Sequence, residues 1–141
     1  MNENKLKHLE LIQIVITRMN TNSFMIKGWM AALVAALFAL SAKDADQRFL
    51  YVTFFPILFF WALDAFYLSQ ERQFRALYED VCKKTDADID FSMKKTKHNI
   101  GKNTWFRSTF SEPLLLTYPP VLVLVFIINA YMRYSLKSHG C

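Results

Sequence analysis

Hydrophobic residues gather into three long stretches of the chain, and polar, charged segments separate these stretches. They run roughly over Gly28–Ala42, Phe49–Leu68 and Leu114–Met132. A helix needs about 20 mostly apolar residues to cross the ~30 Å hydrocarbon core of a bilayer. The second and third stretches reach that length, and the first does so when Phe24–Lys27 is included. The pattern predicts an all-α integral membrane protein with three transmembrane helices.

The segment before the first stretch has a different pattern. Over residues 4–19, apolar side chains fall on about half of a helical surface, opposite Lys7, Glu10 and Arg18. The polar run Asn20–Ser23 interrupts this pattern, and Ser23 is a candidate N-cap for the first span. Residues 1–23 therefore predict a separate amphipathic helix. It is expected to lie in the membrane interface or to pack against copies of itself.

The helical pattern of the second stretch continues beyond the length of a membrane span. Its apolar face persists from Tyr67 to Val81, which predicts one helix from about Phe49 to Lys84. Such a helix would project ~20 Å into the cytoplasm at 1.5 Å per residue. Its cytoplasmic face must pack against another element, either the N-terminal helix or a sister chain.

These patterns divide the chain into five segments. A transmembrane hairpin over residues 24–68 follows the N-terminal helix, and its polar outer turn falls on Lys43–Arg48. Residues 69–112 form the cytoplasmic helical extension and a basic loop. The third span covers residues 113–134, in which Tyr118–Pro120 must bend or restart the helix. Residues 135–141 form an external tail.

Charge placement predicts the orientation of the spans. The formal net charge is +5, and most Lys and Arg residues lie in the N-terminal segment and in residues 69–112. Cytoplasmic loops of membrane proteins carry such an excess. The N-terminus and the long connection are therefore expected inside the cell, and the C-terminus outside. Cys82 falls on the cytoplasmic side, where a disulfide is not expected.

Asp64 is a carboxylate within the second span. A carboxylate at a helix centre costs about 2.5–3.5 kcal/mol on insertion scales, and less near an end. On a helical wheel Asp64 shares a face with Thr53, Glu71 and Arg75. This stripe is expected to line a water-filled path or to bind a partner helix. The alternative is that Asp64 forms an ion pair at the interface with Lys27 or Arg72.

Small residues recur every four positions along the first span. One row is Gly28, Ala32 and Ala36, and a second is formed by Ala31, Ala35 and Ala39. Such rows allow close approach of helix backbones in lipid. They predict contacts with neighbouring subunits or, as the alternative, with the second span of the same chain.

Cations in and after the helical extension are candidates for holding phosphate groups: Arg72, Arg75, Lys83, Lys84, Lys94, Lys95, Lys97 and Lys102. Attraction to anionic inner-leaflet lipid also explains the cluster at 94–102, and the sequence alone favours this explanation. Trp105 and Phe106 are expected as an interfacial anchor. The histidines are isolated and no glycine-rich phosphate loop occurs. No metal, cofactor or enzymatic activity is expected.

The first 82 residues contain motifs that resemble a family of small bacterial membrane proteins. These motifs are Ile16–Phe24, Lys27–Trp29, Ala36–Asp44, Phe55-Pro56, Phe60-Trp61, Asp64, Tyr67, Gln70–Arg72, Phe74-Arg75 and Leu77-Tyr78. The family comprises multi-span effectors encoded beside nucleotidyltransferases in antiphage defence, and the membrane effector of the Hailong system is the nearest in resemblance. The resemblance covers about residues 5–82.

The resemblance implies an oligomeric ion channel of the bacterial inner membrane, here expected as a tetramer. A nucleotide or short DNA oligomer from the partner nucleotidyltransferase would gate the channel, and opening would depolarise the membrane. Since three helices cannot enclose a hydrated path, channel activity requires a ring of subunits. The pore or gate is expected at Asp64, Thr53, Gly28, Ala32 and Ala36, and the cations named above would capture the ligand.

Two other functions fit the residues. A non-conducting adaptor would recruit a cytoplasmic enzyme through the face from Tyr67 to Val81. A membrane-disrupting protein would act through its N-terminal amphipathic helix.

Overall fold

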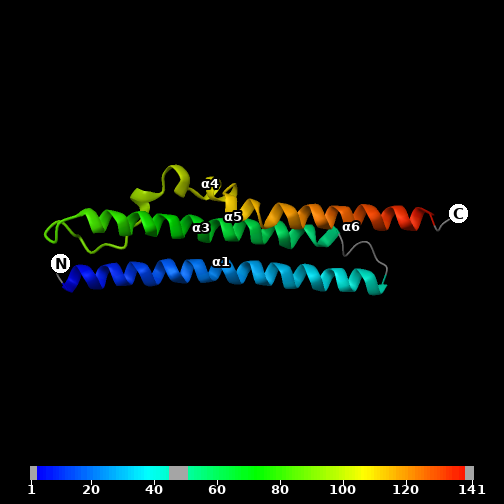
Figure 1. Cartoon of the computed structure of the whole chain (residues 1–141), viewed down its shortest axis with the longest axis horizontal. Coiled ribbons are helices and arrows are strands. Elements are labelled where there is room, and N and C mark those ends of the chain that lie inside the picture. The colour runs from blue at the N-terminus through cyan, green and yellow to red at the C-terminus, as the bar shows by residue number, and fades with distance from the viewer. Residues whose placement is uncertain (1–2, 45–50, 139–141) are drawn as a thin grey trace.

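The computed structural model describes residues 3–44 and 51–138 of the 141-residue chain. The described part is helical and contains no strand. Three long helices, α1, α3 and α6, lie along a common direction (Figure 1). The all-α prediction is confirmed.

Helix α1 is a single uninterrupted element from Glu3 to Asp44. Its 42 residues extend ~63 Å at 1.5 Å per residue. The predicted break at Asn20–Ser23 is therefore wrong, and so is the separate N-terminal helix lying in the plane of the interface. The polar side chains in this run are accommodated within the helix. Thr21 Oγ1 donates a hydrogen bond to the Thr17 carbonyl over 3.0 Å, and Ser23 is buried against another helix.

Helix α3 runs from Phe54 to Lys83, antiparallel to α1 (Figure 1). Its end matches the prediction within one residue. Its expected start at Phe49 lies outside the described residues, as does most of the expected turn at 43–48. Pro56 falls in the first turn of α3, where a missing N–H costs no helical hydrogen bond.

The N-terminal half of α1 packs against the C-terminal half of α3. Their contact is a buried apolar cluster of Leu9, Ile12, Ile16, Phe74, Leu77, Val81 and, from the following segment, Ile89. The face of α3 that needed a partner is thus covered by the N-terminal helix of the same chain. One of the two predicted alternatives is confirmed, and the other, a sister chain on this face, is not needed.

A connection of short helices returns the chain along α3. It comprises η1 (Thr96–His98), η2 (Gly101–Asn103), α4 (Trp105–Thr109) and α5 (Glu112–Leu115). Helix α6 then runs from Tyr118 to Ser138. The chain restarts as a helix at the Tyr-Pro-Pro sequence, as predicted, with both prolines in the first turn. The expected tail from residue 135 is still helical up to Ser138.

A second buried apolar cluster joins all three long helices. It contains Met30 and Val34 of α1, Ile57 and Ala65 of α3, and Tyr118 and Val125 of α6, together with Leu114 of α5. Along α1, this cluster lies nearer the C-terminal end than the first cluster does, and it includes residues of α6. The fold is therefore a long α1–α3 hairpin whose one half also carries α6.

Two helical stretches are long and apolar enough to cross a membrane, Glu3–Ser41 and Glu112–Tyr134. Only 22% of each apolar window is buried, so most of its apolar side chains face outward. Phe24, for example, is 77% exposed and Phe126 is 67% exposed. Within the described residues α3 does not meet the same criterion.

Candidate functional site

A buried polar cluster lies where α1, α3 and α6 meet. Asp64 of α3 is 0% exposed, and its carboxylate is bound by three side chains. Lys27 Nζ lies 2.5 Å from Oδ2, Tyr118 OH donates to Oδ2 over 3.0 Å, and Ser23 Oγ donates to Oδ1 over 2.5 Å. We call these four residues the Asp64 cluster. Such charge-assisted hydrogen bonds are the strong class in proteins.

Local sequence explains why α1 supplies two of the ligands. Ser23 and Lys27 are four residues apart and therefore lie on the same helix face. Lys27 Nζ also donates to Ser23 Oγ over 2.9 Å, which fixes both side chains relative to the carboxylate. The pair turns toward α3 together with Ile26 and Met30, which are buried.

Tyr118 occupies the first residue of α6 and ties that helix to α3. Its hydroxyl lies 3.3 Å from the Phe60 carbonyl as well as 3.0 Å from Asp64. Its ring stacks on Trp61 with the ring centres 5.9 Å apart and the planes 2° from parallel. Since Tyr118 is completely buried, the start of α6 has a fixed position on the hairpin.

The two side chains of the Lys27–Asp64 ion pair differ in their exposure to solvent. The Asp64 side chain is fully buried, while that of Lys27 is 27% exposed. A buried carboxylate is costly unless a cation and hydrogen-bond donors compensate it. The cluster supplies both, so it locks three helices together. Of the predicted alternatives for Asp64, the ion pair with Lys27 is the one that the structure contains.

The residues predicted for a pore fall into two places. Thr53 and Asp64 are buried within the protomer. Gly28, Ala32 and Ala36 lie exposed on the side of α1 that faces away from α3. Apart from the local backbone of α1, no atom lies within 4 Å of the position that a Cβ on Gly28 would take. Gly28, Ala32 and Ala36 are thus not buried against α3, and the structure does not bring the five residues together.

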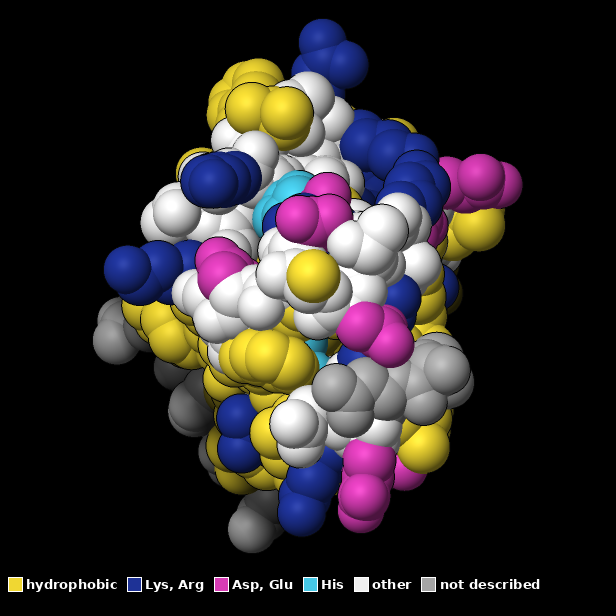
Figure 2. All heavy atoms as spheres, turned by 90° about the vertical axis from the view of Figure 1, so that its left-hand side faces the viewer, with side chains coloured by type: hydrophobic (Ala, Val, Ile, Leu, Met, Phe, Trp, Pro, Cys, Tyr) yellow, Lys and Arg dark blue, Asp and Glu magenta, His cyan; other side chains and the backbone are white. Residues whose placement is uncertain are grey.

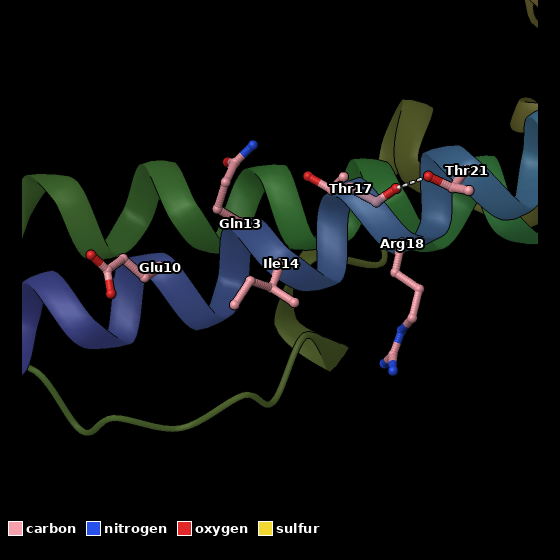
Figure 3. A pocket seen from close by; sticks show the side chains of 6 residues that line it. All are labelled: Glu10, Gln13, Ile14, Thr17, Arg18 and Thr21. Atoms are coloured by element: carbon pink, nitrogen blue, oxygen red, sulfur yellow. Dashed lines mark hydrogen bonds between the residues drawn. The ribbon is translucent and has the colours of Figure 1, made fainter.

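The outward side of α1 continues without interruption into the N-terminal half of the helix. There, six side chains line a shallow hollow of about 620 Å³: Glu10, Gln13, Ile14, Thr17, Arg18 and Thr21 (Figure 3). Ile14 lies at its centre and is 62% exposed. We call the side of α1 that carries Ile14, Thr21, Gly28, Ala32 and Ala36 the open face.

The predicted ligand-binding cations separate into two grooves. The Arg72 groove, about 360 Å³, is lined by Arg72, Arg75, Ala76, Glu79, Lys102 and Asn103. The Lys97 groove, about 400 Å³, contains Lys84, Lys94 and Lys97 among acidic and hydroxyl side chains. Figure 2 views the molecule end-on, from the left-hand side of Figure 1. On this face Lys and Arg side chains are interspersed with Asp and Glu side chains. The cations do not form one continuous basic platform.

Two of the cations lie apart from the groove linings. Lys95 places its ammonium 4.9 Å from the centre of the Phe74 ring, a cation–π contact. Burial lowers the pKa of Lys95 below its ordinary value. Lys83 is exposed at the end of α3.

Sequence reasoning missed Lys5, which closes the end of α3. It is buried, and its Nζ donates to the Lys84 carbonyl over 2.7 Å and to the Cys82 carbonyl over 3.4 Å. A cation is favourable there because the carbonyl end of a helix carries partial negative charge. The spacing of three or four residues between Lys5, Leu9, Ile12 and Ile16 was a usable signal, since it places Lys5 on the buried face.

Two tryptophan side chains dock α4 on α3. Trp61 Nε1 donates to the Thr109 carbonyl and Trp105 Nε1 to the Ala62 carbonyl, each over 3.0 Å. Phe106 and Phe110 remain exposed on α4. The predicted interfacial aromatic residues thus lie beside the Asp64 cluster, where α6 begins.

Comparison with family models, with curated proteins and with solved structures gives no match.

Proposed function

We propose that this protein is one subunit of an oligomeric membrane channel, with three spans per subunit and its N-terminus in the cytoplasm. The observation that carries the proposal is the open face of α1. Gly28, Ala32 and Ala36 are exposed there, on a helix long and apolar enough to cross a bilayer. Small residues at this spacing allow two helices to approach closely in lipid, so another copy of the chain is the partner that they fit.

The buried polar groups favour a path between subunits. The carboxylate of Asp64 is consumed by its cluster and Thr53 is fully buried. Neither side chain is available to line a hydrated path through a single protomer. A ring of α1 helices, most simply a tetramer, would instead surround a central path.

The Asp64 cluster has a gating role in this proposal. It holds the start of α6 and the middle of α3 against α1, so a change in the cytoplasmic segments can reach the spans through it. As the resemblance implies, the gating signal would be a nucleotide or short DNA oligomer produced during phage infection. The response would be depolarisation of the bacterial inner membrane.

The two other candidate functions have less support. An adaptor was expected to recruit its enzyme through the face from Tyr67 to Val81, but Phe74, Leu77 and Val81 are buried against α1. A membrane-disrupting N-terminal peptide would need to act as a separate helix, whereas these residues belong to α1. Neither has a free surface of the expected kind among the described residues.

Assembly and conductance test the proposal together. We expect the detergent-purified protein to elute with a mass of several protomers and to give ion currents in planar bilayers. Ala32→Leu should reduce both, because a larger side chain separates the packed helices. Ala130→Leu is the matched control, since Ala130 is exposed on α6. A monomeric protein without current would refute the proposal.

A further inference from the structure

The Arg72 groove brings together cationic side chains from two parts of the chain. Arg72 and Arg75 are three residues apart on α3 and share a helix face. Lys102 and Asn103 come from η2, and together these side chains line about 360 Å³. Pockets of about 300–1,000 Å³ are the usual size for small ligands.

The guanidinium groups are oriented before any ligand arrives. Arg72 Nη1 donates to the Lys102 carbonyl over 3.0 Å, and Arg75 Nη2 lies 2.7 Å from Glu71 Oε1. A guanidinium carries five N–H donors in a planar arrangement. Each recorded contact uses one nitrogen, which leaves further donors of both arginines uncommitted among the described residues.

The opposite wall of the groove is also held in place. The Asn103 carbonyl accepts from Ser69 Oγ over 2.6 Å and from Gln73 Nε2 over 3.3 Å. These bonds fix η2 on α3, so the backbone of Lys102 has a set position relative to the arginines. A pre-ordered site loses less conformational entropy when it binds.

Charge and geometry favour an anion with several oxygen atoms. Three cations and one carboxylate, Glu79, line the Arg72 groove, and Arg75 there already pairs with Glu71 at 2.7 Å. In the Lys97 groove Lys84 likewise pairs with Asp80 at 3.0 Å, and the other cations of that groove are lysines. Arginine matches phosphate oxygens in pairs, whereas lysine acts as a point charge.

We propose that the Arg72 groove binds a phosphate group, carried either by a lipid headgroup or by a soluble phosphate compound. This proposal deepens the function proposed above, because it identifies the chemistry of the gating signal and the place where it binds. The groove wall continues through η2 into α4, whose Trp105 is bonded to α3 beside the Asp64 cluster. Occupancy of the groove would thus act on the segment that leads to α6.

Pyrophosphate, titrated calorimetrically into the full chain in nonionic detergent, tests the site directly. We expect saturable binding that Arg72→Gln and Arg75→Gln each weaken about tenfold or more, since each removes a charge-assisted hydrogen bond. Glu79→Gln should tighten binding, because it removes the one opposing carboxylate of the groove lining. Lys7→Gln is the matched control: it removes one positive charge from an exposed position on α1, away from the groove lining, and should leave the affinity unchanged.

Nanodiscs distinguish the two sources of phosphate. If anionic phospholipid abolishes pyrophosphate binding that persists in pure phosphatidylcholine, a lipid headgroup occupies the groove. If binding is equal in both, the natural ligand is a soluble compound.

The proposal is overturned if pyrophosphate does not bind, or if Lys7→Gln weakens binding as much as the arginine variants do. Channel currents measured on the same preparations separate this failure from failure of the proposed function. Currents that persist without phosphate binding would remove the site alone, whereas phosphate binding without currents would remove the channel alone.

Discussion

Removing the cation from the Asp64 cluster should strongly destabilise the folded protein. In Lys27→Met, the Asp64 carboxylate would stay fully buried with hydrogen bonds from Ser23 and Tyr118 only. Breaking a buried ion pair by removing one partner typically costs 3–5 kcal/mol. Because the Lys27 side chain is 27% exposed, water partly replaces the lost partner. We therefore expect a loss of about 3 kcal/mol, near the lower end of that range.

The effect can be measured by unfolding the protein in mixed detergent micelles while helicity is followed by circular dichroism. Lys7→Met provides the control, since Lys7 is an exposed lysine on the same helix. Adding Asp64→Leu to Lys27→Met should restore much of the stability, because the uncompensated charge is then gone. The coupling between the two changes should lie in the range of about 0.5–3 kcal/mol seen for contacting residues.

Two outcomes would refute this reasoning. One is a Lys27→Met variant that loses no more stability than Lys7→Met. The other is a double-mutant cycle with no coupling between Lys27 and Asp64. Either outcome would mean that the carboxylate is hydrated or neutral in the folded protein, and that the cluster does not hold the three helices together.

Three further predictions concern other parts of the fold. Ile12→Ala should destabilise the protein by about 2–5 kcal/mol, because Ile12 is completely buried between α1 and α3; chemical denaturation will measure this loss. Gly28→Leu should leave unfolding nearly unchanged, since nothing lies near the added side chain, yet it should lower the oligomer mass seen by light scattering. A hydrogen bond from Lys84 holds the pKa of Asp80 below its ordinary value. The stabilising contribution of this pair is therefore fully present at pH values above that ordinary pKa, and it is lost as the pH falls through the depressed pKa. Lys84→Gln should raise the pKa of Asp80, which an NMR titration of its carboxyl group measures.

The sequence predicts the long-range packing of the hairpin well because one physical requirement determines it. The apolar face of α3 extends beyond the length of a span and has to be covered. Residues 4–19 carry the matching apolar face, and α3 runs antiparallel to α1 (Figure 1). Ile12, Leu77 and Val81 belong to one buried cluster, which is one of the two packings that these periodicities allow.

The Asp64 cluster could be predicted only in part. Lys27 was one of two cations expected as an ion-pair partner of Asp64 at the membrane interface, and the structure contains that pair. Tyr118 lies 54 positions away in sequence, in a Tyr-Pro-Pro run that indicates only a helix start. Helical periodicity reports which residues share a face on one helix, but it does not report which faces of separate helices meet. The hydroxyl groups of Ser23 and Tyr118, which donate to Asp64, could therefore be identified only from the structure.

The predicted break at Asn20–Ser23 was wrong for the same reason: the sequence does not show which faces of separate helices meet. This difference matters for the proposed function. A run of short polar residues favours a helix end when water is its only partner. Here Ser23 finds a buried carboxylate as its partner, so the residue expected to end a helix instead fastens a continuous one. Because α1 is uninterrupted from Glu3 to Asp44, its N-terminal and C-terminal halves cannot tilt independently without bending the helix near the Asp64 cluster. In the proposed channel, a signal received on the N-terminal half of α1 would therefore either shift α1 as a whole or break that cluster.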